Sequence, residues 1–172
     1  MNRNGVAKFE KVSLEQFMID WKTHFPLTSE NKMKAIYDSI VLPKRGTTGS
    51  AGYDFYLPDE IGLREFSSIV IPTGIRCKID DGWVLNIYPR SGHGFKYGVR
   101  LANTVGVIDS DYYGASNEGH IHVKLVNDSN LSKEIIFEAH TAFCQGVFIP
   151  FGTTVDDDVE AKRIGGFGST DK

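Results

Sequence analysis

The residues best suited to chemistry lie close together in segment 103–114, whose sequence is NTVGVIDSDYYG. Apolar residues around Gly106 predict a strand, and the Ser-Asp pair that follows is typical of a tight turn. Such a hairpin would present Asp109, Tyr112 and backbone amides to one small pocket. A carboxylate held beside a ligand is a candidate general base for a water molecule. Asp109 and Asp111 are alternatively solvated turn residues, because Asp favours turns for local hydrogen-bonding reasons.

Length and composition indicate one globular domain. The chain has 172 residues, of which 41% are hydrophobic and 24% are charged, so it is long enough to bury a core. Its net charge of −3 gives no basic field over the whole molecule. Direct nucleic-acid binding is therefore not expected, although a local Arg and Lys cluster suffices for a small phosphate ligand.

The sequence gives no signal for a membrane or for export. No apolar run approaches the roughly 20 residues of a membrane helix. The first residues lack the apolar core of a signal peptide. Cys77 and Cys144 lie in apolar segments typical of strands, without CxxC spacing or clustered histidines, so zinc is not indicated. We expect a cytoplasmic protein with two reduced thiols in its core.

Residues 1–41 are expected to form an extension of two amphipathic helices. Ser13 and Gln16 have the spacing of a capping box, and Ser29 is suited to cap a second helix that ends before Pro43. Apolar residues at helical spacing would form the inner faces: Leu14, Phe17, Met18, Trp21 and Phe25, then Met33, Ile36, Tyr37 and Ile40. These faces predict a cap packed on the main domain. A docking surface for a partner protein is the alternative.

Residues 42–155 have the pattern of an all-β domain. Glycine becomes frequent and separates short β-rich segments: 53–57, 68–71, 74–79, 83–88, 121–126, 134–137 and 143–149. Such spacing predicts a sandwich, barrel or jelly roll. Helices do not alternate with these segments, which disfavours Rossmann and P-loop enzymes.

Residues 156–172 begin with an acidic link and end with the glycine-rich sequence GGFGST at 165–170. Glycine loses the most backbone entropy on ordering, so a disordered terminus is one interpretation. The other is a flexible arm that orders over a ligand, with Phe167 stacked on a ring and hydroxyls of Ser169 and Thr170 on phosphates.

Five short motifs follow one another: AGYDF at 51–55, PRSG at 89–92, segment 103–114, QGV at 145–147 and GGFGST at 165–170. Together they resemble the five motifs of the trimeric deoxyuridine triphosphatases (dUTPases), and they leave the first 40 residues unmatched. The resemblance implies a β jelly roll that forms a homotrimer with active sites at subunit interfaces. It also implies Mg²⁺-dependent hydrolysis of dUTP to dUMP and pyrophosphate, which keeps uracil out of DNA and supplies dUMP for thymidylate synthesis.

The resemblance assigns roles on the nucleoside side. Asp109 matches the family's carboxylate that orients water toward the α-phosphorus. Tyr112 matches the tyrosine that packs against deoxyribose and would exclude a 2′-hydroxyl. The positions that match the uracil reader are Asn103 and the backbone of Gly106, Val107 and Ile108.

Further roles lie on the phosphate side. Arg90, Ser91 and Gly92 match the phosphate motif, in which they offer a charged fork, a hydroxyl and an unobstructed amide. Gln145 matches the glutamine near the α-phosphate. Asp54 matches the aspartate linked to the water shell of Mg²⁺, which the triphosphate itself mainly binds; an ordinary ion pair is the alternative for Asp54. The expected catalytic residues are Asp109, Arg90 and Gln145.

Two of the departures of the sequence from the family concern nucleotide contacts. Where the family usually has Arg three residues before GGFG, this chain has Lys162; either Lys162 or the following Arg163 could bind the γ-phosphate, and we favour Arg163 because a guanidinium binds bidentately. An insertion at 115–119 precedes the return strand, so return-strand contacts to uracil stay open. The arm residues expected on the nucleotide are Phe167, Gly168, Ser169 and Thr170.

Two alternative functions stay open. A dCTP deaminase, or a bifunctional enzyme, shares the fold and uses a glutamate on the return strand. Here Lys124 lies near that position, and Glu118 lies in the insertion. Phage-type members of the family also bind repressor proteins, for which the N-terminal helices or the 115–119 loop are candidate contacts.

Overall fold

The structure, a computed structural model, describes residues 5–129, 134–161, 163 and 165. Within them, β-strands predominate and every strand pair is antiparallel. The largest sheet has the order β2 (Lys44–Arg45), β3 (Tyr53–Tyr56), β12 (Ala142–Pro150), β7 (Trp83–Pro89), β9 (Gly106–Ile108). The second has the order β5 (Ser68–Pro72), β10 (His122–Asn127), β8 (Val99–Leu101). Two further pairs join β1 (Ala7–Lys11) to β6 (Ile75–Ile79) and β4 (Ile61–Leu63) to β11 (Ile135–Phe137).

The seven β-rich segments predicted from the sequence are confirmed to within one or two residues. Their inward-facing side chains form one core, in which Phe55, Leu85 and Ile87 are almost fully buried. Cys77 and Cys144 are free and buried, as expected. Burial raises the pKa of the Cys77 thiol to about 12, so this thiol stays protonated and acts as a core residue.

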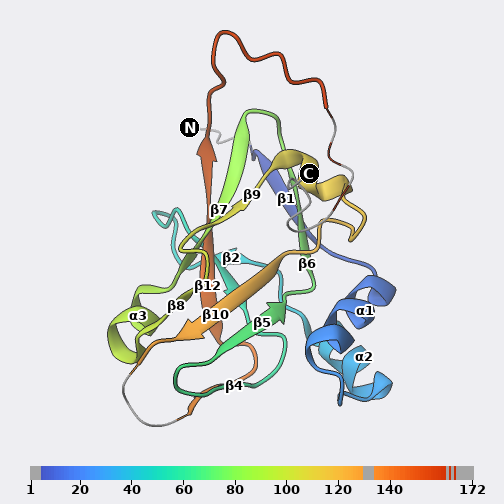
Figure 1. The fold of residues 1–172 in the computed structure, drawn as a ribbon, viewed down its shortest axis with the longest axis vertical. Coiled ribbons are helices and arrows are strands. Elements are labelled where there is room, and N and C mark those ends of the chain that lie inside the picture. The colour runs from blue at the N-terminus through green and yellow to red at the C-terminus, as the bar shows by residue number, and fades with distance from the viewer. Residues whose placement is uncertain (1–4, 130–133, 162, 164, 166–172) are drawn as a thin grey trace.

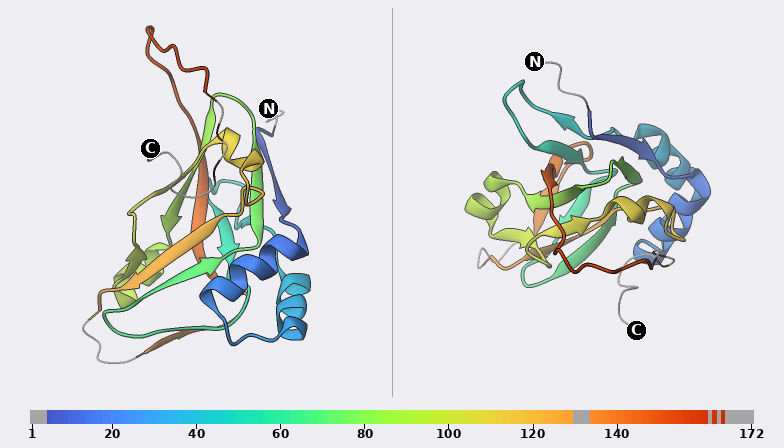
Figure 2. Two further views of the ribbon diagram at one scale, coloured as in Figure 1. Left: turned by 45° about the vertical axis from the view of Figure 1, so that its right-hand side comes forward. Right: turned by 90° about the horizontal axis from the view of Figure 1, so that it is seen from above.

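The two predicted helices and both of their caps are confirmed. In α1 (Leu14–His24), Ser13 Oγ accepts a hydrogen bond from Gln16 N at 3.1 Å. In α2 (Glu30–Ser39), Ser29 Oγ accepts one from Lys32 N at 3.3 Å. The helices lie together against one side of the β-structure (Figures 1 and 2), and their inner faces are buried. The strand β1, which precedes them and pairs with β6, was not predicted.

The insertion after Gly114 holds the start of α1. Glu118 accepts hydrogen bonds from the backbone N of Ser13 at 2.8 Å and from its Oγ at 2.6 Å. Gly119 has a φ of +70°, and a Cβ there would lie 2.6 Å from the carbonyl oxygen of Tyr112. Only glycine fits this close approach. The N-terminal extension and the 115–119 insertion therefore bind each other.

The predicted turn at Ser110 and Asp111 is present, since Tyr112 N donates to the carbonyl oxygen of Asp109 at 3.2 Å, but the predicted hairpin is wrong. The strand β9 pairs with β7, and a 3₁₀ helix, η1 (Ser110–Gly114), follows it. The physical reason is Tyr112, which is only 4% exposed because its ring turns into the core. The chain instead turns between β8 and β9, where Thr104 has a φ of 63°.

No helix among the described residues is long and apolar enough to cross a membrane.

Candidate active site

A pocket of about 340 Å³ opens between β9 and β10. Within the described residues β9 is paired only to β7, so its second edge can offer backbone donors and acceptors to a ligand. The strand β10 is paired to β5 on one side and to β8 from Leu125 on the other, and the carbonyl oxygen of Lys124 accepts from Ala102 N at 2.9 Å. On that second side, only His122 and Val123 at the start of β10 have no strand partner among the described residues. The pocket is lined by all four expected uracil-reading residues and by residues that face them: Asn103, Gly106, Val107 and Ile108, then His24, His122, Val123 and Lys124, with Val70, Ile87, Leu101 and Ala102. We call it the base pocket.

Asp109 lies at the end of β9, beside this pocket, with its side chain 49% exposed. Arg163 Nη2 donates to Asp109 Oδ2 at 2.8 Å, and Arg163 Nε donates to Asp111 Oδ1 at 3.1 Å. Charge-assisted bonds of this kind hold both carboxylates in fixed positions. The chain after β12 projects away from the body and turns back to η1 (Figures 1 and 2), which brings Arg163 to this place.

Tyr112 lies behind Asp109 and anchors the insertion. Its hydroxyl donates to the carbonyl oxygen of His120 at 2.9 Å and accepts from Asn117 Nδ2 at 2.9 Å. Burial raises the pKa of the Tyr112 phenol, which therefore stays neutral. The guanidinium of Arg163 lies 5.5 Å from the ring centroid, so Arg163 covers the face that was expected to meet a sugar.

A second pocket, of about 440 Å³, gathers residues of the phosphate side: Asp54, Arg90, Ser91 and Gln145. Arg90 Nε lies 3.5 Å from Asp54 Oδ1, so the ion pair considered for Asp54 is present. The register of β12 with β3 places Gln145 opposite Asp54. Gln145 Nε2 donates to the Pro89 carbonyl oxygen at 3.3 Å.

Glycines and a short helix shape this second pocket. A Cβ on Gly52 would lie 2.4 Å from Gln145 Oε1, so only glycine at position 52 leaves room for the Gln145 side chain. The helix α3 (Ser91–Tyr97), which was not predicted, begins at the phosphate motif. Gly92 lines an adjoining pocket of about 370 Å³ together with Arg90 and Ser91.

The single chain thus forms two groups of candidate residues. Among the described residues, no hydrogen bond or ion pair links Asp54, Arg90 or Gln145 to Asp109 or Arg163. Several expected residues lie outside the described part of the chain: Lys162, Phe167, Gly168, Ser169 and Thr170.

Sequence reasoning missed three polar residues of the base pocket: His24, His122 and Lys124. The alternation in HIHVK at 120–124 carried a usable signal, since residues two apart on a strand share a face. His24 had no such signal, because its place depends on how α1 packs against the main domain.

Comparison with known proteins identifies the family. The dUTPase family model matches residues 38–171. A deoxyuridine 5'-triphosphate nucleotidohydrolase of Lactococcus lactis subsp. lactis (strain IL1403) is 40% identical over 134 residues, which cover 76% of this chain and 88% of the relative. The crystal structure of dUTPase from Streptococcus mutans is similar with a TM-score of 0.63 and 33% identity, covering 85% of this chain and 97% of that one.

A more distant likeness concerns the fold alone. A mutant dUTPase from phage phi11 of S. aureus, described with a structural Mg(II) ion, has a TM-score of 0.61 at 16% identity and covers 91% of this chain and 98% of that one. The β-structure seen here is therefore the dUTPase jelly roll, as expected. With most of its length matched by the family model and with relatives above 30% identity, the chain belongs to the dUTPase family.

Proposed function

We propose that this protein hydrolyses dUTP to dUMP and pyrophosphate, and so keeps uracil out of DNA and supplies dUMP for thymidylate synthesis. One observation carries the proposal: the base pocket lies between the unpaired edge of β9 and the start of β10, and the exposed carboxylate of Asp109 directly follows β9. Uracil needs donors for its two carbonyls and an acceptor for its N3–H. The free edge of β9, the first residues of β10 and the Asn103 side chain can offer both.

In the proposed reaction, Asp109 orients a water molecule and takes its proton while the water oxygen attacks the α-phosphorus. The bond between the α-phosphorus and the bridging oxygen breaks, and pyrophosphate leaves. A positioned base of this kind contributes about 10²–10⁴-fold to the rate. Arg90, Ser91 and Gly92 bind phosphate oxygens, and Gln145 approaches the α-phosphate.

In the proposed reaction, Arg163 changes partners when the nucleotide binds. In this structure Arg163 neutralises Asp109 and Asp111 and covers the ring of Tyr112. A triphosphate offers it stronger partners, so we expect Arg163 to leave for the γ-phosphate. Its departure frees Asp109 for water and opens the Tyr112 ring to the deoxyribose. The arm from Phe167 to Thr170 is expected to close over the nucleotide.

The residues present fit Mg²⁺ bound mainly by the substrate. Asp54 is 21% exposed and lies at the second pocket beside Arg90, where phosphates are expected. Mg²⁺ keeps several waters and takes few protein ligands besides phosphates, so one nearby carboxylate suffices to hold its water shell. Bound there, the ion would neutralise phosphate charge and favour the leaving pyrophosphate.

We further propose a homotrimer whose active sites lie between subunits. The separation of the Arg90 group from the Asp109 group within one chain supports it, because a second copy can bring the two groups together. We propose that the protein is cytoplasmic, in keeping with its two free, buried thiols.

Deamination of dCTP has no observation in its favour. Glu118, the nearest glutamate in the sequence, is bonded to Ser13 and lies 3.8 Å from Arg76, and it does not line the base pocket. A repressor partner would meet only the outer faces of α1 and α2, since their inner faces are buried.

The test measures pyrophosphate and ammonia released from dUTP, dCTP, dTTP and UTP, each with Mg²⁺. Pyrophosphate from dUTP alone is the expected result. Release of ammonia from dCTP would show that the protein is a deaminase. If no nucleotide gives a product, the protein acts by binding and is not a hydrolase.

A further inference from the structure

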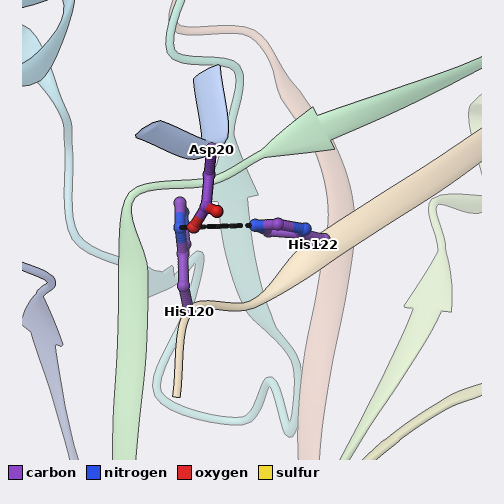
Figure 3. Close-up of side chains that lie close together, drawn as sticks. All are labelled: Asp20, His120 and His122. Atoms are coloured by element: carbon purple, nitrogen blue, oxygen red, sulfur yellow. Dashed lines mark hydrogen bonds and ion pairs between the residues drawn. The ribbon is translucent and has the colours of Figure 1, made fainter. Parts of the chain in front are cut away.

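Three side chains meet where α1 approaches the start of β10 (Figure 3). Asp20 comes from α1, His122 is the first residue of β10, and His120 lies two residues before it. His120 Nδ1 lies 2.5 Å from Asp20 Oδ2, and His122 Nε2 lies 3.3 Å from the same oxygen. Asp20 precedes the part of the chain that the family model matches.

The backbone fixes where the protons of this cluster are. The amide N–H of Gly74 donates to His120 Nε2 at 2.7 Å, so Nε2 carries a lone pair. The His120 side chain is fully buried, and this burial lowers its pKa and keeps the ring neutral. The single proton of the neutral ring therefore lies on Nδ1, which donates to Asp20.

Asp20 is ionised in this arrangement. Burial by itself raises its pKa, but hydrogen bonds from His120, His122 and Gln16 outweigh burial and hold the pKa well below its usual value. The Gln16 amide donates to Asp20 Oδ2 at 2.9 Å.

This proton arrangement argues against a metal ion at the three side chains. A metal bound by His120 Nδ1 needs the lone pair there, which moves the ring proton to Nε2. That proton would then face the N–H of Gly74 across 2.7 Å, with two donors and no acceptor. Histidines that bind metals normally donate from their other nitrogen to an acceptor, which this site lacks.

The same logic sets the tautomer of His122. Its Nε2 faces the carboxylate of Asp20 and lies 3.3 Å from His120 Nδ1, which already carries a proton. Nε2 of His122 must therefore donate to Asp20, and in the neutral ring Nδ1 is left as an acceptor. The second ring nitrogen faces away from Asp20 (Figure 3). No hydrogen bond joins it to any described residue, and His122 lines the base pocket.

We propose that His122 selects the base by accepting a hydrogen bond from a base N–H at Nδ1, and that Asp20 is the positioning residue that fixes this tautomer. For uracil the donor is N3–H, so the inference rests on the proposed function for the identity of the base. The N-terminal extension thereby becomes part of the active site. His24, also from α1, lines the same pocket, with its ring 5.7 Å from that of His122.

The experiment compares the affinity of the full-length protein for dUMP, measured by calorimetry, in the wild type, in Asp20→Ala and in Asp20→Asn. Alanine removes the oxygen that accepts from both histidines, so it no longer fixes the orientation or the tautomer of the His122 ring. We expect dUMP binding to weaken about 10-fold in Asp20→Ala, because the base N–H then faces a donor in part of the molecules. The amide oxygen of Asp20→Asn can still accept from both rings, so this variant should bind dUMP within about threefold of the wild type. The ¹⁵N shifts of the His122 ring should report a mixture of tautomers in Asp20→Ala and one tautomer in Asp20→Asn.

Two further variants separate positioning from folding. Asp59→Asn removes the 3.0 Å ion pair with Lys32, which also ties the extension to the main domain but lies away from the base pocket. Its dUMP affinity should equal that of the wild type. His122→Asn places an amide oxygen near the position of Nδ1, so it should bind dUMP within about threefold of the wild type. Adding Asp20→Ala to it should cause no further loss.

The proposal is overturned if Asp20→Ala binds dUMP normally, if Asp59→Asn weakens binding equally, or if the losses of Asp20→Ala and His122→Asn add in the double variant. Binding of Zn²⁺ that depends on Asp20 would also overturn it. Because dUMP binding is read without turnover, a wild type that binds dUMP but does not hydrolyse dUTP contradicts the proposed function alone.

Discussion

Replacing Phe17 by Ala tests whether the N-terminal extension is a structural part of the fold. Phe17 is fully buried and lies at the centre of the contact between α1 and the main domain. Its ring centroid is 5.3 Å from that of Trp21, 5.6 Å from Tyr37 and 6.3 Å from His120. The substitution therefore removes contacts to both helices and to the return strand.

The magnitude follows from burial. Truncating a buried Phe to Ala usually costs about 3–5 kcal/mol, because lost transfer free energy and a residual cavity add. Alanine recovers about 0.5 kcal/mol through its higher helix propensity. The free energy of unfolding should fall by about 3 kcal/mol, and Tm should fall by about 6–12 °C for a chain of this size.

Urea unfolding at one fixed protein concentration measures the loss, since any oligomer makes stability depend on concentration. Ile19→Ala, on the same helix but with a 56% exposed side chain, is the matched control and should change stability by less than about 0.5 kcal/mol. A loss below about 1 kcal/mol for Phe17→Ala would show that α1 is not needed by the main domain. The docking interpretation would then replace the cap.

Two further predictions concern the second pocket and pH. Gly52→Ala should displace the Gln145 side chain and lower kcat for dUTP by about 10²-fold. The control is Gly62→Ala in β4, whose Cβ would lie 2.6 Å from Glu134 Oε1, and its kcat should stay unchanged. Equal kcat values for the two variants would show that Gln145 has no part in the mechanism. Burial lowers the pKa of His120, which faces Asp20, His122 and Glu118, so the unfolded chain binds a proton at this ring more readily than the folded chain does. The free energy of unfolding should therefore fall as pH drops below about 6.5, by up to ~1.4 kcal/mol per pH unit. His120→Gln, which can still accept from Gly74, should flatten that slope in urea titrations between pH 5 and 7, and an unchanged slope would refute the assignment.

Local chemistry explains which parts of the fold could be predicted from the sequence. The caps at Ser13 and Ser29 and the apolar period of α1 act within a few residues, so sequence alone locates them. The strands of the main domain are bounded by glycine and turn residues for the same reason. Segment 103–114 was identified as the centre of the site, and its residues do line the base pocket or lie beside it.

Contacts between distant segments explain what was missed. The strand β1 looks like a short polar stretch until β6 pairs with it. The turn at Ser110 became a 3₁₀ helix because Tyr112 enters the core and bonds to His120 beyond the insertion. The contact of Asp20 with His120 spans 100 residues, and no local pattern indicates it.

The most direct measurement of the central claim is pyrophosphate release from dUTP with Mg²⁺ by the wild type and by Asp109→Asn, with dUMP affinity measured alongside. Asparagine keeps the size of the side chain and cannot accept a proton from water. We expect hydrolysis by the wild type, a loss of about 10²–10⁴-fold in kcat for the variant, and dUMP affinity within a few fold. A variant that turns over dUTP within tenfold of the wild type would contradict the assignment of Asp109 as the residue that activates water.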